Sequence, residues 1–462
     1  MTLIKSISGI RGTIGGLPGE GLTPPDVVKF VSAFAHWQLQ RTGNRKIVIG
    51  RDGRLSGEMV RNLAVGTLQG MGIDVIDLDL STTPTVEIAV PEEGAGGGII
   101  LTASHNPRQW NALKLLNEKG EFISAEDGAE VLEIAEKADF SYAEVENLGK
   151  VERNDTYFQK HIDMILALPL VDAEAIRKAG FRVVVDAVNS TGGIVVPQLL
   201  KALGVVAIEE LYCVPNGEFP HNPEPLAENL TTLSSKVVEG KADLGIAVDP
   251  DVDRLVFVCE DGHLFGEEYT LVAVADYVLG HQAGNTVSNL SSTMALRDVT
   301  LKHGGEYTAA AVGEVNVVNA MKATNAVIGG EGNGGVIYPA LHYGRDALVG
   351  IALFLTHLAR HSGPVSALRD TYPSYHISKN KITLSPDMDI DGLLRQIRDR
   401  YRDQPINTTD GVRIEFDGQW VHLRRSNTEP IIRIYSEGDS EAAAEQLANK
   451  IISDFKEFML PQ

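Results

Sequence analysis

The stretch TPPDVVKFVSAFAHWQLQRTGNRKIVI, residues 23–49, predicts how the N-terminal part of the chain folds. Thr23 is a typical helix N-cap, the two prolines after it suit the first helical turn, and Asp26 adds an acid in that turn. Val27 to Gln40 is amphipathic and predicts a helix, and Lys46 to Ile49 is a short apolar run that predicts a strand. A helix that leads into a short strand favours an α/β layer fold.

The alternation of helix and strand patterns continues outward from this stretch and then restarts twice. The further predicted strands are 73–80, 98–101, 182–186, 244–248, 255–258, 286–289 and 325–329, with a helix after Ser56. The last segment differs, because it combines a helix over 389–401, two strands around Asp417-Gly418 and a closing amphipathic helix that includes 444–455. We therefore predict three α/β units and a smaller C-terminal α+β unit. The expected boundaries are 1–153, 154–257, 258–370 and 371–462.

Composition excludes several classes of protein. The chain has 462 residues, with 62 acidic and 41 basic side chains and a formal net charge of −21, which argues against binding to nucleic acid or to an anionic membrane. Two cysteines cannot form a disulfide framework, and the first residues lack the apolar core of a signal peptide. No window offers the ~18 uninterrupted apolar residues of a membrane span. We expect a cytoplasmic protein.

The first unusual loop is Thr102-Ala-Ser-His-Asn-Pro107, directly after a glycine-rich strand, with Asn111 and Lys114 a few residues further on. A serine at a strand end beside a histidine is a candidate nucleophile or phosphoryl carrier. Ser104 and His105 also have a simpler interpretation, since serine and asparagine at a strand end often only stabilise a turn.

The second loop, Asp249-Pro-Asp-Val-Asp-Arg254, also follows an apolar strand. Asp249, Asp251 and Asp253 at alternate positions can converge on one hard cation, and oxygen ligands suit Mg²⁺. The pattern begins like an EF-hand, but Arg254 stands where that loop requires glycine. The alternative is three solvated acids on a surface loop.

Two later segments and one near the N-terminus are candidates for binding anionic sugars. Segment 329–335 is rich in glycine, which lets its backbone approach a ligand closely. Glu331 and Asn333 could then form hydrogen bonds to the ligand. A flexible surface loop is an equally good interpretation. Segment 424–430 resembles a phosphate cradle, because it combines arginines, hydroxyls and turn N–H groups, with Arg433 on the next strand. The alternative is a cluster of surface salt bridges. Arg11 lies between glycines in 8–12 and is otherwise an exposed cation in a turn.

Together and in this order, these loops resemble those of the α-D-phosphohexomutases, the phosphoglucomutase/phosphomannomutase superfamily, over essentially the whole chain. The resemblance identifies 102–107 as the phosphoserine loop, 249–254 as the metal loop, 330–335 as the sugar-specificity loop and 424–430 as the phosphate-binding loop. It implies that the three α/β units have mixed sheets and that the four domains surround a central active-site cleft.

The family's chemistry would place a phosphoryl group on Ser104 and one Mg²⁺ between that group and the three aspartates. A hexose 1- or 6-phosphate would be converted through a 1,6-bisphosphate, which would also serve as activator. Lys114 would be the general base, a task that needs a lowered pKa. Arg11, His105 and Asn111 would position groups around Ser104, and Arg254 would support the metal loop. The non-reacting phosphate would be held by Arg424, Ser426, Asn427, Thr428 and Arg433.

This chain departs from the family pattern in two places. Asn333 replaces a frequent serine and Gly335 a frequent histidine of the sugar loop, where Glu331 would accept hydrogen bonds from the 3- and 4-hydroxyls. Gly313 and Glu314, which we include among the sugar-binding residues, stand where many members carry Gly-His. The variant loop resembles that of archaeal-type and some bacterial phosphoglucosamine or phosphomannose mutases. We expect interconversion of glucosamine phosphates, with mannose and glucose phosphates as the alternative.

Two hypotheses from other classes compete with this one. The strand that leads into Asp249-Pro-Asp251 also resembles the aspartyl-nucleophile loop of haloacid-dehalogenase-type phosphatases, but that interpretation leaves the Ser104 and Arg424 loops without a role. A non-catalytic sugar-phosphate sensor would not need Ser104, Lys114 and three aspartates. We expect small-molecule hexose phosphates as the only partners, without nucleic acid or membrane, and a monomer or homodimer.

Overall fold

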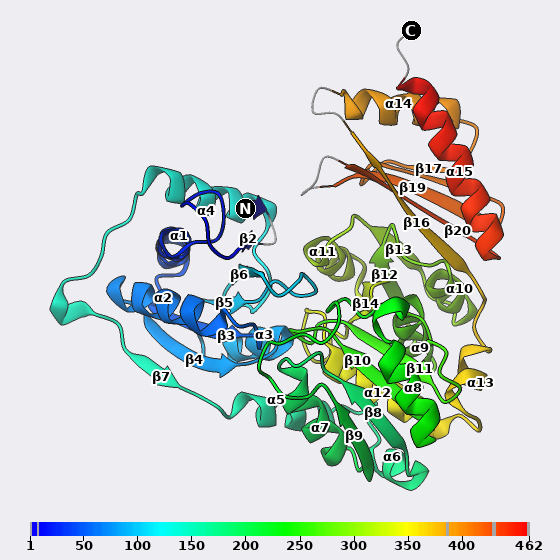
Figure 1. The fold of residues 1–462 in the computed structure, drawn as a ribbon, viewed down its shortest axis with the longest axis horizontal. Coiled ribbons are helices and arrows are strands. Elements are labelled where there is room, and N and C mark those ends of the chain that lie inside the picture. Colours follow the sequence, from blue (N-terminus) through cyan, green and yellow to red (C-terminus); the bar gives the residue numbers. More distant parts are fainter. Residues whose placement is uncertain (1, 7–8, 385–387, 427–430, 460–462) are drawn as a thin grey trace.

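The computed structural model describes residues 2–6, 9–384, 388–426 and 431–459. Four sheets follow one another along the chain, each built from one continuous stretch (Figure 1). Three of them combine parallel and antiparallel strand pairs, and the fourth is antiparallel throughout. The predicted fold class, three α/β units with mixed sheets and a smaller C-terminal α+β unit, is confirmed.

The first sheet has seven strands in the order β1-β2-β6-β5-β3-β4-β7. Its strands are β1 (Leu3–Ser6), β2 (Gly9–Thr13), β3 (Lys46–Arg51), β4 (Asp74–Leu80), β5 (Gly97–Leu101), β6 (Trp110–Leu116) and β7 (Val151–Arg153). Its helices are α1 (Pro24–Thr42), α2 (Gly57–Gly70), α3 (Thr83–Glu92) and α4 (Ala125–Lys137), with a 3₁₀ turn at Val145–Asn147. Apolar side chains alternate along β3, so Ile47 and Ile49 pack with α1, α2 and α4 on one face, while Val48 packs with α3 on the other.

The second and third sheets have four strands each, in the orders β11-β10-β8-β9 and β13-β12-β14-β15. The second unit contains α5 (Tyr157–Leu166), α6 (Ala173–Ala179), β8 (Arg182–Asp186), α7 (Gly192–Ala202), β9 (Ala207–Leu211), α8 (Thr231–Gly240), β10 (Leu244–Val248) and β11 (Leu255–Cys259), with a 3₁₀ turn at Ala227–Asn229. The third contains α9 (Glu267–Leu279), β12 (Asn285–Asn289), α10 (Ala295–Lys302), β13 (Tyr307–Ala310), α11 (Glu314–Thr324), β14 (Ala326–Glu331), β15 (Gly335–Ile337), α12 (Ala347–Arg360) and α13 (Val365–Arg369). One hydrophobic core runs through both units, with α9 and α12 almost completely buried in it.

The fourth sheet has the order β16-β20-β19-β18-β17. Its elements are β16 (His376–Thr383), α14 (Ile390–Arg400), β17 (Ile406–Asn407), β18 (Val412–Phe416), β19 (Gln419–Arg425), β20 (Ile431–Gly438) and α15 (Glu441–Phe458). The two helices cover one face of the sheet and enclose a separate core (Figure 1). Among the described residues, no helix is long and apolar enough to cross a membrane.

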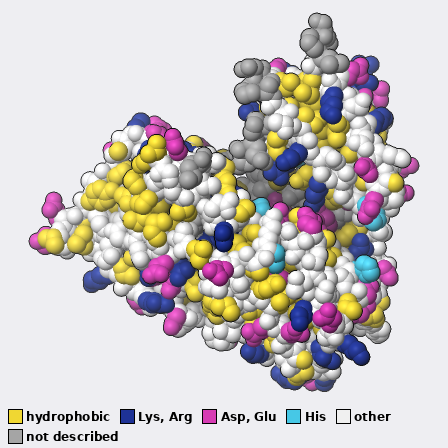
Figure 2. All heavy atoms as spheres, in the orientation of Figure 1, with side chains coloured by type: hydrophobic (Ala, Val, Ile, Leu, Met, Phe, Trp, Pro, Cys, Tyr) yellow, Lys and Arg dark blue, Asp and Glu magenta, His cyan; other side chains and the backbone are white. Residues whose placement is uncertain are grey.

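Polar contacts join the first and fourth domains to the central pair. The Gly53 N–H donates to Ser190 Oγ over 3.0 Å, which connects the first sheet to the second. His422 of the fourth domain lies 2.9 Å from Ser291 Oγ of the third, and the Val312 N–H donates to Asp410 over 3.0 Å. Figure 2 shows the surface hollowed between the first and the C-terminal domain.

Candidate active site

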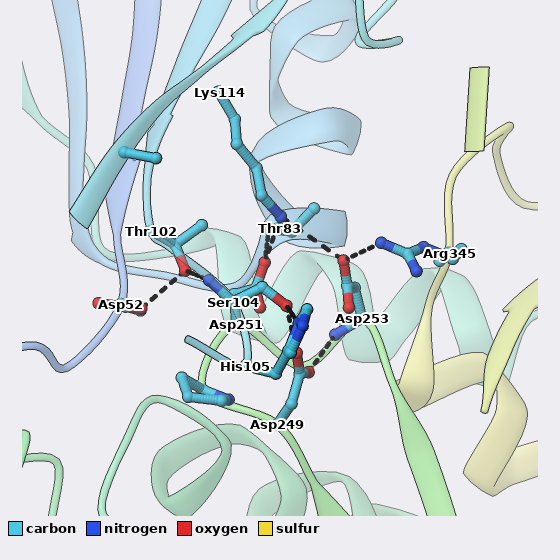
Figure 3. A network of polar contacts seen from close by, with 12 residues as sticks. Asp52, Thr83, Thr102, Ser104, His105, Lys114, Asp249, Asp251, Asp253 and Arg345 are labelled. Carbon is cyan, nitrogen blue, oxygen red and sulfur yellow. Dashed lines mark hydrogen bonds and ion pairs between the residues drawn. The ribbon is translucent and has the colours of Figure 1, made fainter. Parts of the chain in front are cut away.

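Ser104 lies just beyond the C-terminal end of β5, in a turn that its backbone enters with φ +48°. A non-glycine residue rarely adopts this left-handed conformation, so the surrounding contacts must hold it. Its hydroxyl donates to Asp249 Oδ2 over 2.7 Å and lies 3.4 Å from His105 Nδ1 (Figure 3). The structure thus joins the serine loop of the first domain to the aspartate loop of the second. Burial, together with Arg254 and Arg11, lowers the pKa of His105 well below its ordinary value.

A buried ion pair beneath this loop holds its backbone. Arg54 and Asp52 follow β3, their side chains are fully buried, and Arg54 Nε lies 2.9 Å from Asp52 Oδ2. The guanidinium also donates to the backbone carbonyls of Ser104, Asn106, Pro107 and Trp110. Asp52 in turn accepts a hydrogen bond from Thr102 Oγ1 over 2.7 Å. One arginine therefore supplies the donors that stabilise the turn around Ser104.

The three aspartates lie in the loop between β10 and β11. All three are completely buried, so the alternative of three solvated acids on a surface loop is wrong. Ligand oxygens of Asp249, Asp251 and Asp253 lie within 4.8 Å of one another. Burial and repulsion from the other two aspartates raise the pKa of Asp249 well above its ordinary value. Asp251 Oδ1 and Asp253 Oδ1 are buried and have no hydrogen-bond partner among the described residues. Buried carboxylate oxygens that converge without donors fit a Mg²⁺ ion.

Lys114 reaches the same loop from β6, a strand that the sequence analysis did not predict. Its Nζ lies 2.7 Å from Asp251 Oδ2 and 3.6 Å from Asp253 Oδ2, and Thr83 Oγ1 donates to Asp251 over 2.5 Å (Figure 3). Burial acts to lower the pKa of Lys114, but Asp251 and Asp253 outweigh it and hold the pKa above its ordinary value. The lowered pKa that a general base requires is therefore not produced by the protein groups alone.

Two of the residues expected around Ser104 contact its neighbours instead. Arg11, on β2, donates to Asn106 Oδ1 over 2.8 Å. Asn111, on β6, donates to Ser56 Oγ over 2.9 Å and accepts from the Ala112 N–H, so its described contacts do not reach Ser104. Asn111 therefore positions β6 against the start of α2.

The predicted sugar-binding residues Glu331 and Glu314 are buried, and both are bound by Arg345, which the sequence analysis missed. Arg345 also lies 2.7 Å from Asp253 Oδ2, so it connects the metal loop to the sugar loop. Burial alone would lower the pKa of Arg345, but its three carboxylate partners raise it far above the ordinary value. The two glutamates differ, because burial raises the pKa of Glu314 whereas Arg345 and Asn289 hold that of Glu331 below its usual value.

The backbone of the sugar loop completes this arrangement. The Gly313 N–H donates to Glu331 Oε1 over 3.0 Å, from a residue whose φ of +116° suits glycine. Asn333 Oδ1 accepts from the Gly335 N–H over 3.3 Å, so it stabilises the turn. Arg254, at the end of the metal loop, lies 3.2 Å from Glu224 and donates its backbone N–H to Asp249.

The predicted phosphate-binding residues lie on the fourth sheet. Arg424 on β19 and Arg433 on β20 are direct cross-strand partners. Like charges directly opposite destabilise a sheet unless an anion compensates them. Burial and Arg433 lower the pKa of Arg424 against the opposing effect of Asp410. Ser426 is buried at the end of β19, whereas Asn427 and Thr428 lie outside the described residues.

Sequence reasoning missed Asp52, Arg54, Thr83 and Arg345, although the first two and Arg345 had a signal. Arg51-Asp-Gly-Arg54 and Gly344-Arg-Asp346 each place an acid and arginines beside a glycine, and the first follows an apolar strand. Acids and arginines next to each other at the end of a strand can form ion pairs that hold the loops of an active site in place. Thr83 has no comparable local pattern.

Four family models match consecutive parts of the chain. They are the α/β/α domains I, II and III of phosphoglucomutase/phosphomannomutase, at residues 3–142, 159–262 and 266–375, and the C-terminal domain at 386–453. The chain therefore belongs to the phosphoglucomutase/phosphomannomutase family of phosphohexomutases, and it is an isomerase of that class.

Individual relatives cover almost the whole chain. A phosphoglucomutase/phosphomannomutase of Thermococcus kodakarensis is 36% identical, over 94% of this chain and 96% of its own. A phosphoglucosamine/phosphogalactosamine mutase of Sulfurisphaera tokodaii is 31% identical, over 96% and 97%. The crystal structure of a phosphoglucomutase/phosphomannomutase family protein from Burkholderia thailandensis matches with a TM-score of 0.85 at 26% identity, over 98% and 97%.

Proposed function

We propose that this phosphohexomutase interconverts hexose 6-phosphate and hexose 1-phosphate through a phosphoserine at Ser104, with glucosamine phosphate as its preferred substrate. The observation that carries the proposal is the 2.7 Å contact of the Ser104 hydroxyl with Asp249, inside a buried cluster of three aspartates and Lys114. A serine whose only role was to stabilise a turn would not need this cluster.

In the proposed reaction, phosphoserine transfers its phosphoryl group to a free hydroxyl of the bound hexose phosphate. The bond from phosphorus to Ser104 Oγ breaks as the bond to the sugar oxygen forms, and the hydroxyl proton passes to a base. The 1,6-bisphosphate then turns over and returns its other phosphoryl group to Ser104. A Mg²⁺ held by Asp249, Asp251, Asp253 and a phosphoserine oxygen would supply positive charge to the transferring group. The same bisphosphate, added from outside, would phosphorylate an idle enzyme and act as activator.

Two side chains of this chain are placed to handle the proton. His105 Nδ1 lies 3.4 Å from Ser104 Oγ, so it can exchange a proton near the reacting group. Lys114 loses part of its electrostatic stabilisation when a cation shares Asp251 and Asp253, which lowers its pKa toward the range of a general base. We infer that Lys114 is the base in the loaded enzyme and that His105 assists.

The charges around the sugar loop support an amino-sugar phosphate as the substrate. Glu314, Glu331 and Asp253 all contact Arg345, and Lys114 lies 3.6 Å from Asp253, so three carboxylates outnumber two cations among the described contacts. An ammonium at C2 of glucosamine would be favoured there over the hydroxyl of glucose or mannose. The relative from Sulfurisphaera tokodaii, named for amino-sugar phosphates, points the same way. Phosphomannomutase/phosphoglucomutase is the second candidate, and the Thermococcus kodakarensis relative carries that name.

A rate panel tests the substrate. With Mg²⁺ and a sugar 1,6-bisphosphate present, kcat/KM is measured for glucosamine, glucose, mannose and N-acetylglucosamine phosphates. We expect glucosamine phosphate to be fastest, and Glu314→Gln to reduce its advantage over glucose phosphate. A preference for mannose or glucose phosphate would overturn the amino-sugar assignment and leave the mutase assignment intact.

Asp249→Asn gives a sharp test of the metal. Because burial and repulsion oppose ionisation of Asp249, we expect the metal-free variant to be at least as stable as wild type. Mg²⁺ binding stabilises a folded protein by about 2.7 kcal/mol at a hundredfold excess over Kd, and the variant should lose most of this gain together with activity. Melting curves with chelator and with Mg²⁺ measure both effects. Mg²⁺ stabilisation that survived in the variant would contradict the site.

The paired arginines of the fourth sheet are expected to hold the non-reacting phosphate in both orientations of the bisphosphate. Loss of one charge-assisted bond to phosphate costs roughly 1.5–3 kcal/mol, so Arg424→Ala should lower kcat/KM about ten- to a hundredfold in both directions. Arg433→Ala should do the same, whereas Arg425→Ala, at the exposed neighbouring position, serves as the control. A loss confined to one direction would rule out a shared anchor.

A further inference from the structure

A second cluster of metal-ligating side chains lies where three parts of the chain meet. His161 comes from α5, His342 from the loop before α12, and Asp346 from the N-terminus of α12. Their ligand atoms lie within 4.8 Å of one another. His161 and Asp346 are completely buried, and the His342 side chain is 13% exposed. Glu87 of α3 borders the cluster, with Oε2 3.4 Å from His342 Nδ1.

The spacing of the donor atoms fits a tetrahedral cation. His161 Nε2 and His342 Nε2 lie 2.9 Å and 3.2 Å from the same oxygen, Asp346 Oδ2. A tetrahedral ion with bonds of about 2.0–2.1 Å holds its ligands about 3.3 Å apart. The two imidazole planes are inclined by 85°, so the rings approach Asp346 from different directions. Small shifts of the side chains would admit an ion between the three atoms.

The surroundings of the three ligands also resemble those of a metal site. Each imidazole has a polar partner for its other nitrogen, namely Thr85 Oγ1 at 3.0 Å from His161 Nδ1 and Glu87 Oε2 beside His342 Nδ1. If these two oxygens accept the Nδ1 protons in the metal-bound protein, each ring has the tautomer that leaves Nε2 free to bind a metal. The other Asp346 oxygen accepts the backbone N–H groups of Leu348 and Val349, which fixes the carboxylate.

The lack of hydrogen bonds to the buried Glu87 side chain is an independent observation. This side chain is only 2% exposed, and neither of its oxygens makes a hydrogen bond among the described residues. Because both oxygens are buried without a donor, the protein groups alone leave this side chain poorly compensated. A cation bound by the two histidines would supply the missing positive charge through the His342 ring.

We propose that His161, His342 and Asp346 bind a borderline divalent cation of the Zn²⁺ class, with Thr85 and Glu87 orienting the two histidines. Two imidazoles and one carboxylate suit such ions, whereas the three-aspartate loop offers only the oxygens that suit Mg²⁺. The site joins α3 of the first domain to α5 and α12, and it fixes the segment that carries Arg345, the residue directly before Asp346. Its role is to hold the first domain against the central pair in the arrangement that aligns Ser104 with Asp249.

Cobalt substitution tests the site on the full-length enzyme. The protein is stripped with a chelator and titrated with Co²⁺ in the presence of excess Mg²⁺, which occupies the three-aspartate loop. We expect one equivalent of Co²⁺ with the visible absorption of four-coordinate nitrogen and oxygen ligation. Zn²⁺ should displace it and raise the melting temperature. His161→Gln and His342→Gln should abolish the absorption, and Glu87→Gln should weaken Zn²⁺ binding by roughly 10–100-fold.

Two controls separate this site from others. Asp251→Asn should keep the Co²⁺ spectrum, because it changes only the three-aspartate loop. His221→Gln removes a histidine that lies 3.0 Å from one carboxylate, Asp186, without a second histidine, and should also keep it. The partly exposed His342 makes His342→Gln the variant that best preserves folding, which circular dichroism checks. Absence of the tetrahedral spectrum in wild type, or its persistence in folded His342→Gln, would overturn the proposal and leave the mutase assignment untouched.

Discussion

Ser104→Ala is expected to lose mutase activity by on the order of 10⁴-fold or more, because it removes the atom that we propose carries the phosphoryl group. Intact-protein mass spectrometry after incubation with a sugar 1,6-bisphosphate should find phosphorylated wild type and unphosphorylated variant. The metal-dependent melting of the variant should be retained in part, since the three aspartates are unchanged.

Because Ser104 has φ +48°, alanine at this position keeps the backbone strain, and Ser104→Gly, which relieves it, is the better-folded companion variant. Both should be inactive. Ser32→Ala is a matched control, since Ser32 is buried on α1 and, within the described part of the chain, its hydroxyl hydrogen-bonds only to the Tyr142 hydroxyl, 3.1 Å away. Substantial turnover by either Ser104 variant would exclude the phosphoserine route.

Arg54→Ala is expected to have the largest effect on stability. Its removal leaves Asp52 as an unpaired buried charge, which costs about 3–5 kcal/mol, and it also leaves the carbonyls around Ser104 without their donor. Activity should fall as well, because the turn that positions Ser104 loses its support. Two of the three tryptophans, Trp37 and Trp110, lie in the first domain, so their fluorescence in urea reports on its unfolding.

Arg51→Ala is the comparison for this prediction. Arg51 pairs with Asp79 over 2.7 Å, but both side chains are partly exposed, so its loss should cost only about 1 kcal/mol or less. Arg54→Lys should recover part of the ion pair but not the several carbonyl contacts, because an ammonium lacks the planar fork. Equal stability of Arg54→Ala and Arg51→Ala would show that the buried pair is dispensable.

The sequence predicted the fold class and the loops of the candidate site because both depend on local patterns. Strands such as 244–248 are continuous apolar runs, and the polar residues directly after them stand out. β6 was missed because Trp110–Leu116 lacks a clean alternation, as every residue after Trp110 is buried. The position of Lys114 beside Asp251 depends on this strand pairing with β5 and on the packing of two domains.

Burial of the aspartates and the role of Arg345 could not be predicted for a related reason. Asp253 and Arg345 are separated by 92 positions, and no local pattern records that their segments meet. Three alternate aspartates look solvated in sequence, yet the first and third domains cover them. Cross-domain contacts of single side chains decide these features, and the sequence of each loop alone does not encode them.

The buried bridge between Lys114 and Asp251 has a consequence for biosynthesis. The two residues are 137 positions apart, so the ribosome completes the first domain well before its partner carboxylate exists. Before Asp251 is synthesised, Lys114 has no carboxylate partner from the second domain. Before the domains dock, the three aspartates likewise lack the ammonium of Lys114. Each half attracts the other across water, so docking of the two domains brings these opposite charges together. A polypeptide truncated before Asp249 would lack both the Lys114–Asp251 bridge and the cluster of three aspartates.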